Sequence, residues 1–199
     1  MIKPQEALDR LMEGNKRFVN NASIHPNRCQ ETKASLVSKQ TPYAIILSCS
    51  DSRVPLEIIF DAGLGDIFAI RTAGHVLSQE VMGSIEYAVV HLGVKLIMIL
   101  GHDNCGAVHS AVDTYKSKTL DTVSPNLKSI LMEIYPAIEK VDENLSEEDF
   151  HKEAIRQNVK YQAKDLLTKD AYIADKVKTG EIMVVKANYN LHTSEVEIF

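Results

Sequence analysis

The chain has 199 residues, of which 45% are hydrophobic and 25% are charged, and its formal net charge is −5. Acidic and basic residues are interspersed without a basic stripe, which argues against a nucleic-acid partner. The longest apolar runs, such as LIMIL at 96–100, are too short to span a bilayer, so no membrane partner is expected. The charged N-terminal segment does not resemble a signal peptide, and we therefore expect a cytoplasmic protein.

Apolar segments of two kinds alternate along the chain. Residues 5–20 have the apolar spacing of a helix, whereas YAIILS at 43–48 is a continuous apolar run typical of a strand buried on both faces. A helix is predicted between Ser78, a residue that often begins helices, and Gly93, a residue that often ends them. The other predicted strands lie at 66–71, 94–101, 181–190 and 195–199, and the other predicted helices at 105–117, 124–143 and 146–167.

This alternation predicts an α/β fold. We expect a mostly parallel β-sheet of about four core strands plus an edge strand, flanked by helices. No repeat or linker divides the sequence, so residues 1–199 are expected to form a single domain. The polar stretch at 20–40 is the longest irregular region, and residues 1–40 are expected to form an N-terminal helical arm.

Cysteine and histidine side chains follow two of the predicted strands. Cys49 ends the strand at 43–48, and His102 and Cys105 follow the strand at 94–101. Ligands gather at the carboxyl ends of strands in such folds, so these side chains are expected to meet at one edge of the sheet. A buried cysteine is more often inert, and a lone His-x-x-Cys pair is a weak signal. Their convergence favours a zinc site, and three protein ligands leave a fourth position for water, as in catalytic zinc sites.

Asp51 and Arg53 lie in the loop directly after Cys49. As an exposed ion pair they would contribute only about 0–1 kcal/mol to stability. Beside a zinc-bound water, however, Asp51 can accept a proton or a hydrogen bond, and in a closed form it can ligate the metal itself. Arg53 would keep this carboxylate ionised and off the metal. Asp51 and Arg53 are therefore the predicted catalytic residues.

The segments CSDSRVP and GHDNCGAV, with GSIEYAVVHLGVKLIMILGH between them, resemble the β-class carbonic anhydrases. The resemblance extends over nearly the whole chain. It implies the carbonate dehydratase reaction of a lyase, in which zinc-bound hydroxide attacks carbon dioxide to give bicarbonate and a proton. It also implies one zinc ion per subunit on Cys49, His102 and Cys105, and a homodimer or homotetramer in which the N-terminal helix reaches the partner subunit.

The resemblance also indicates a substrate pocket. One group of relatives, exemplified by plant enzymes, lines this pocket with a glutamine, a phenylalanine and a tyrosine, which correspond here to Gln40, Phe68 and Tyr87. The backbone N–H of Gly106 is a further candidate contact for a substrate oxygen.

A second group of relatives has a tryptophan in a regulatory bicarbonate site. This chain contains no tryptophan and has Ile46 at that position, although Arg71 matches the arginine of the same site. The open-site, plant-type group is therefore favoured. His75 replaces an asparagine of many relatives and is interpreted as a solvated or hydrogen-bonded loop residue rather than a proton-shuttle aid.

Two alternatives remain open at this point. Relatives with the same zinc motifs hydrolyse carbon disulfide or carbonyl sulfide. Zinc could also be structural, in an interaction module without turnover.

Overall fold

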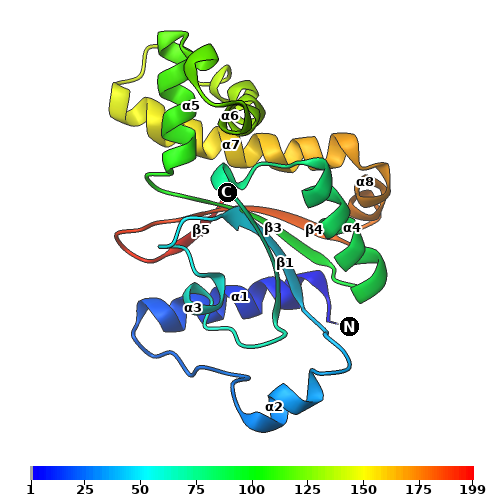
Figure 1. Ribbon diagram of the computed structural model, residues 1–199. Coiled ribbons are helices and arrows are strands. Elements are labelled where there is room, and N and C mark those ends of the chain that lie inside the picture. The colour runs from blue at the N-terminus through cyan, green and yellow to red at the C-terminus, as the bar shows by residue number, and fades with distance from the viewer. Residues whose placement is uncertain (1) are drawn as a thin grey trace.

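The computed structural model describes residues 2–199, which form a central sheet with helices on both faces (Figure 1). Within these residues the sheet has five strands in the order β2-β1-β3-β4-β5. Strands β1 to β4 pair in parallel, and β5 pairs antiparallel with β4. The predicted α/β fold, with four core strands and an edge strand, is therefore confirmed. The strands are β1 (Ala44–Cys49), β2 (Ile67–Thr72), β3 (Leu96–His102), β4 (Met183–Tyr189) and β5 (Val196–Ile198).

The long helices lie where the sequence patterns predict helices. Ser78 accepts a hydrogen bond from the backbone N–H of Val81 at the start of one predicted helix, and Gly93 ends that helix with a φ of 70°. The short helices α2, α3 and α8 were not predicted. The helices are α1 (Pro4–Val19), α2 (Gln30–Ser35), α3 (Leu56–Ile59), α4 (Gln79–Leu92), α5 (Gly106–Ser117), α6 (Pro125–Ile138), α7 (Glu147–Lys169) and α8 (Ala171–Lys178), with 3-10 turns η1 (Ala73–His75) and η2 (Leu120–Thr122).

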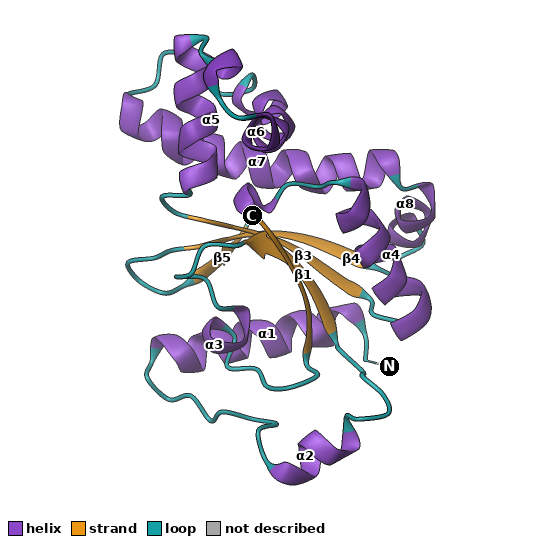
Figure 2. Ribbon diagram, viewed as in Figure 1, coloured by secondary structure: helices purple, strands orange, loops and turns teal. Residues whose placement is uncertain are grey.

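Helices cover the two faces of the sheet unequally (Figure 2). Helices α1 and α3 cover one face, where Leu11 and Ile59 pack in one cluster with Ile46 of β1. Helices α4, α7 and α8 cover the opposite face, which explains why β1 and β3 are buried along their whole length. None of the helices of residues 2–199 has the length and apolar character needed to cross a membrane.

The predicted arm over residues 1–40 divides into two parts. Helix α1 packs on its own sheet through Ala7, Leu8 and Leu11, because its apolar residues repeat at helical spacing. It is therefore part of the core of its own subunit rather than a free arm. Helix α2 buries no residue and lies away from the sheet (Figure 1). Contact of residues 1–40, including the N-terminal helix, with another subunit stays a prediction.

The order of the strands creates a crevice between the carboxyl ends of β1 and β3. The chain leaves β1 toward α3 on one face of the sheet, whereas it leaves β3 toward α5 on the other (Figure 1). Two neighbouring strands whose connections diverge in this way leave the usual ligand-binding crevice of open α/β sheets between them.

Candidate active site

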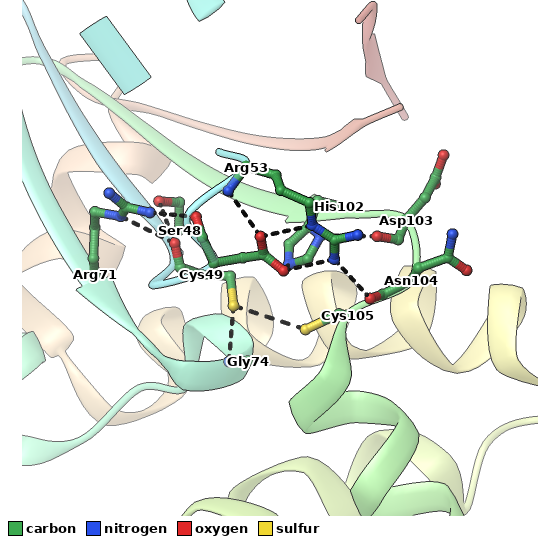
Figure 3. A network of polar contacts seen from close by, with 10 residues as sticks. Ser48, Cys49, Arg53, Arg71, Gly74, His102, Asp103, Asn104 and Cys105 are labelled. Carbon is green, nitrogen blue, oxygen red and sulfur yellow. Dashed lines mark hydrogen bonds and ion pairs between the residues drawn. The ribbon is translucent and has the colours of Figure 1, made fainter. Parts of the chain in front are cut away.

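Three potential metal ligands converge at this crevice. Cys49 is the last residue of β1, His102 is the last residue of β3, and Cys105 directly precedes α5. All three are buried, and their ligand atoms lie within 4.8 Å of one another. The two sulfur atoms are 3.8 Å apart (Figure 3). The structure therefore brings together the predicted zinc ligands, from positions up to 56 residues apart along the chain.

The donor atoms of this cluster suit zinc. The Nδ1 atom of His102 lies 2.8 Å from the backbone carbonyl oxygen of Asp103, so Nδ1 carries the proton and Nε2 offers a lone pair. Among residues 2–199 this buried Nε2 atom has no hydrogen-bond partner, which would be costly unless a metal ion took its place. Two thiolate sulfurs and one imidazole nitrogen form a typical zinc donor set with a fourth position left over.

The two cysteines are electrostatically coupled. A hydrogen bond from the Cys105 thiol lowers the pKa of Cys49 well below its usual range, against the opposing effect of burial, with smaller contributions from His102 and the Gly74 N–H. The same hydrogen bond, together with burial, raises the pKa of Cys105 well above its usual range. The protein alone thus stabilises one thiolate, and a bound cation would be needed to release the second proton.

Asp51 borders this cluster. Its Oδ2 atom lies 3.9 Å from His102 Nε2, so the predicted catalytic carboxylate is at the metal cluster. Arg53 donates to Asp51 from Nε, from Nη2 and from its backbone N–H. These hydrogen bonds hold the pKa of Asp51 well below its usual range, so the carboxylate is ionised.

Arg71 fixes the backbone of the same loop. Its Nε atom donates to the carbonyl oxygen of Cys49 at 3.0 Å, and its Nη2 atom donates to that of Asp51 at 2.7 Å (Figure 3). From the sequence, this arginine was matched only to a regulatory anion site. In the structure it holds the loop that carries Cys49, a predicted metal ligand, and Asp51, the predicted catalytic carboxylate.

A turn that the motifs do not reveal lies against Cys49. The backbone N–H of Gly74, in η1, donates to Cys49 Sγ at 3.4 Å. The next residue, His75, is fully buried and contacts Asn158 Nδ2 through its Nε2 atom. The prediction of a hydrogen-bonded His75 is confirmed, but that of a solvated one is wrong. Burial lowers the pKa of His75 to about 4, so it is neutral near pH 7.

The predicted pocket residues gather elsewhere within the subunit. The rings of Phe68 and Tyr87 are 6.3 Å apart, and Gln40 and Tyr87 line one groove of about 900 Å³. Phe68 is four positions before Thr72, the partner of Cys49 in the sheet, which places it about 13 Å from the metal end of the strands. Phe68 therefore lies away from the metal cluster of its own subunit, and the role of these three residues in the substrate pocket stays a prediction.

Gly106, by contrast, lies at the metal cluster, because it is the first residue of α5 and directly follows Cys105. Apart from its chain neighbours and the backbone of its own helix, a Cβ atom added at Gly106 would have no heavy atom within 4 Å among the described residues. The backbone at this helix start is therefore open to a small ligand.

Comparison with known proteins agrees with this geometry. A family model described as "Carbonic anhydrase" matches residues 44–196, a span that contains all three ligands. The structure of the β-carbonic anhydrase CcaA superimposes with a TM-score of 0.78 at 24% identity, covering 96% of this chain and 94% of that one. The chain belongs to the β-carbonic anhydrase family.

Other members of the β-carbonic anhydrase family are similar over nearly their full length. "Carbonic anhydrase 2" of Mycobacterium tuberculosis is 39% identical over 194 residues, which cover 94% of this chain and 89% of the relative. At 22% identity and a TM-score of 0.72, the fold also matches a β-carbonic anhydrase of Sordaria macrospora, covering 98% of this chain and 97% of that one. The Sordaria structures are described as tetrameric. The similarity to these carbonic anhydrases indicates that this chain is itself a carbonic anhydrase enzyme.

Proposed function

We propose that this carbonic anhydrase uses one zinc ion per subunit, held by Cys49, His102 and Cys105, to interconvert carbon dioxide and bicarbonate. The observation that carries the proposal is the convergence of three buried donor atoms within 4.8 Å. When bound, zinc would supply a Lewis acid that lets a water molecule give up its proton near neutral pH. The net reaction joins carbon dioxide and water into bicarbonate and releases one proton.

Asp51 acts on the attacking water, and Arg53 acts on Asp51. Ionised Asp51 accepts a hydrogen bond from the attacking water and so directs a lone pair of the water toward the carbon atom of carbon dioxide. Arg53 holds Asp51 in this position and keeps the carboxylate from moving onto the His102 Nε2 side of the cluster. Both roles require the carboxylate to stay ionised, as its lowered pKa supports.

The start of α5 favours the anionic product. The N-terminal end of a helix carries a partial positive charge and unpaired N–H groups, which attract anions. The backbone N–H of Gly106 is the group of this kind nearest to Cys105, and the open space beside it supports contact with an oxygen of the substrate.

The active assembly is proposed to be a homodimer or a homotetramer. Phe68 is too far from the metal end of its own subunit, whereas Gln40 and Tyr87 line a groove, beside the Phe68 ring, that a second subunit can enter. Tyr87 is 48% exposed, so its ring, which lies beside Phe68, is accessible to a second subunit. In the proposed assembly, these three residues of one subunit line the substrate pocket of the other.

The site is proposed to be of the open, plant type. Ile46 is fully buried in β1, where the second group of relatives has an indole. The Arg71 guanidinium already binds two backbone carbonyls, which leaves it less free to hold a bicarbonate ion. Without that anion site, nothing pulls Asp51 away from Arg53.

A stopped-flow pH-indicator assay with three gases tests the proposed substrate. We expect turnover of carbon dioxide, with inhibition by small anions that compete for the fourth metal position. Faster turnover of carbon disulfide or carbonyl sulfide would instead assign the site to hydrolysis of those gases. A zinc-loaded protein that turns over none of the three would indicate a structural metal.

A further inference from the structure

The backbone turn that touches Cys49 has an unfavourable conformation. Gly74 and His75 both have positive φ values, of 67° and 46°, and such a value is uncommon for a histidine. A Cβ atom at Gly74 would lie 2.8 Å from Ile134 Cδ1 and 3.2 Å from Ala107 Cβ, so only glycine fits there. The turn therefore needs support from outside if it is to keep the Gly74 N–H on the Cys49 sulfur.

Asn158 of α7 provides this support. Its Nδ2 atom donates to the Gly74 carbonyl oxygen at 2.9 Å and lies 3.0 Å from His75 Nε2, so both amide hydrogens are used on the turn. The side chain is completely buried. A buried amide with these partners fixes the positions of both residues of the turn.

Gln162, one helical turn further along α7, fixes Asn158 in turn. Its Nε2 atom donates to Asn158 Oδ1 and to the Glu133 carbonyl oxygen, both at 3.0 Å. Its Oε1 atom accepts the backbone N–H of Leu77 at 2.9 Å. Rotating the side-chain amide of Asn158 or of Gln162 by half a turn would place one N–H donor against another. Each amide therefore has a single orientation in this network.

We propose that Asn158 and Gln162 are positioning residues for the metal centre, which hold the Gly74 N–H on Cys49 Sγ and thereby slow the loss of the metal. The inference rests on the zinc site of the proposed function. Neither residue touches a metal ligand. The Gly74 N–H is the direct hydrogen-bond partner of Cys49, and such partners commonly change metal affinity by about 10- to 100-fold, so Asn158 and Gln162 act on the metal through the position of Gly74. The network reaches Cys49 from a helix more than 100 residues later in the chain.

Transfer of zinc from the loaded protein to a chromogenic chelator measures this role without any activity assay. We expect Asn158→Leu to release zinc about tenfold faster than the wild type, the lower end of the range for direct partners of a ligand, because Asn158 acts on Cys49 only through Gly74. Gln162→Met, which removes the outer layer of the network, should show a smaller increase. Urea unfolding of each variant separates the effect on the metal from the loss of stability.

Asn15→Leu is the matched control. Asn15 is also a buried amide, 4% exposed, with three backbone partners: the carbonyl oxygens of Ile59 and Ser194 and the N–H of Val196. Its replacement should lower stability while leaving the rate of zinc release within twofold of the wild type.

The possible outcomes separate the two proposals. Release at the wild-type rate from both Asn158→Leu and Gln162→Met, or equal acceleration in Asn15→Leu, would overturn the positioning role while leaving the zinc site intact. A wild-type protein that holds no stoichiometric zinc would overturn the zinc site and the inference together. If Asn158→Leu does not fold, the test uses the rate of zinc release from Gln162→Met compared with that from Asn15→Leu. Faster release from Gln162→Met supports the positioning role, and equal rates overturn it.

Discussion

Arg53 binds both carboxylate oxygens of Asp51, with distances of 2.9 Å from Nε to Oδ1 and 2.8 Å from Nη2 to Oδ2. The backbone N–H of Arg53 adds a third hydrogen bond to Oδ1 at 2.9 Å. A carboxylate held at both oxygens keeps its orientation, and here it stops 3.9 Å short of His102 Nε2. In the proposed zinc site, this geometry would leave the fourth metal position to water and substrate.

Removal of that guanidinium should therefore impair catalysis. We expect Arg53→Ala to lower kcat/KM for carbon dioxide hydration at least tenfold, because Asp51 is then free to turn toward the metal cluster. The stopped-flow rate measures the loss. Arg156→Ala, which breaks a surface ion pair with Glu197, is the control and should keep the wild-type rate. Wild-type activity in Arg53→Ala would reduce the Asp51–Arg53 contact to an ordinary ion pair.

Mixed dimers test whether the pocket is shared between subunits. Cys105→Ala should lack the metal, and the double variant Gln40→Ala, Phe68→Ala should lack the pocket, so each homodimer should be at least tenfold less active than the wild type. A dimer with one subunit of each kind has one intact site, and should recover roughly half of the wild-type activity because two-fold symmetry gives two equivalent sites. Mixed dimers as inactive as their parents would place pocket and metal in the same subunit.

The pH dependence of the rate tests the open-site assignment. The hydrogen bonds from Arg53 lower the pKa of Asp51, so this carboxylate should not titrate in the mildly acidic range. The acid limb of the profile of log kcat/KM against pH should then have the slope of a single proton, and added bicarbonate should not steepen it. A clearly steeper limb, or one sharpened by bicarbonate, would indicate cooperative closure of the site.

Asp61 should make stability depend on pH far from the metal. Burial by itself raises the pKa of Asp61, but hydrogen bonds from Arg17 Nε and from the backbone N–H groups of Ile24 and His25 outweigh it and lower the pKa overall. The resulting stability is present above the ordinary aspartate pKa of about 3.9 and is lost as the pH falls through the lower pKa of the folded state.

Asp61→Asn should consequently lower the free energy of unfolding by about 1.5–3 kcal/mol at pH 7, the usual contribution of hydrogen bonds to a charged group. Urea unfolding at pH 7 and at about pH 3, below the ordinary aspartate pKa, measures the effect, and the variant should lose less stability than the wild type between these two values. Asp121→Asn, at an exposed aspartate, is the control. If the Asp61 variant and the wild type lost equal stability on acidification, Asp61 would not be the source of the pH-dependent stability.

Much of the fold and the ligand set could be predicted from local patterns. The continuous apolar runs of β1 and β3 identify strands buried on both faces, and Cys49 and His102 end these strands, so their meeting follows from parallel pairing. The support of Cys49 by Asn158 could not be predicted, because an asparagine within a helix has no local signal for a partner 84 residues earlier.

The pocket illustrates a different limit. The residue types at Gln40, Phe68 and Tyr87 match the resemblance, but the strand register separates Phe68 from the metal end of its own sheet. Residue identity alone does not say from which subunit a side chain reaches the site. The short helices α2 and α3 escaped prediction because six and four residues carry too little periodicity.

Zinc content and carbon dioxide hydration, measured together on the wild type, Cys105→Ala and Cys29→Ala, test the central claim most directly. Cys29 is an exposed thiol outside the cluster, so its variant should keep one zinc ion per subunit and the full rate. Cys105→Ala should lose stoichiometric zinc and nearly all activity, because two donors remain in place of three. Full zinc and full activity in Cys105→Ala would contradict the assignment of the site.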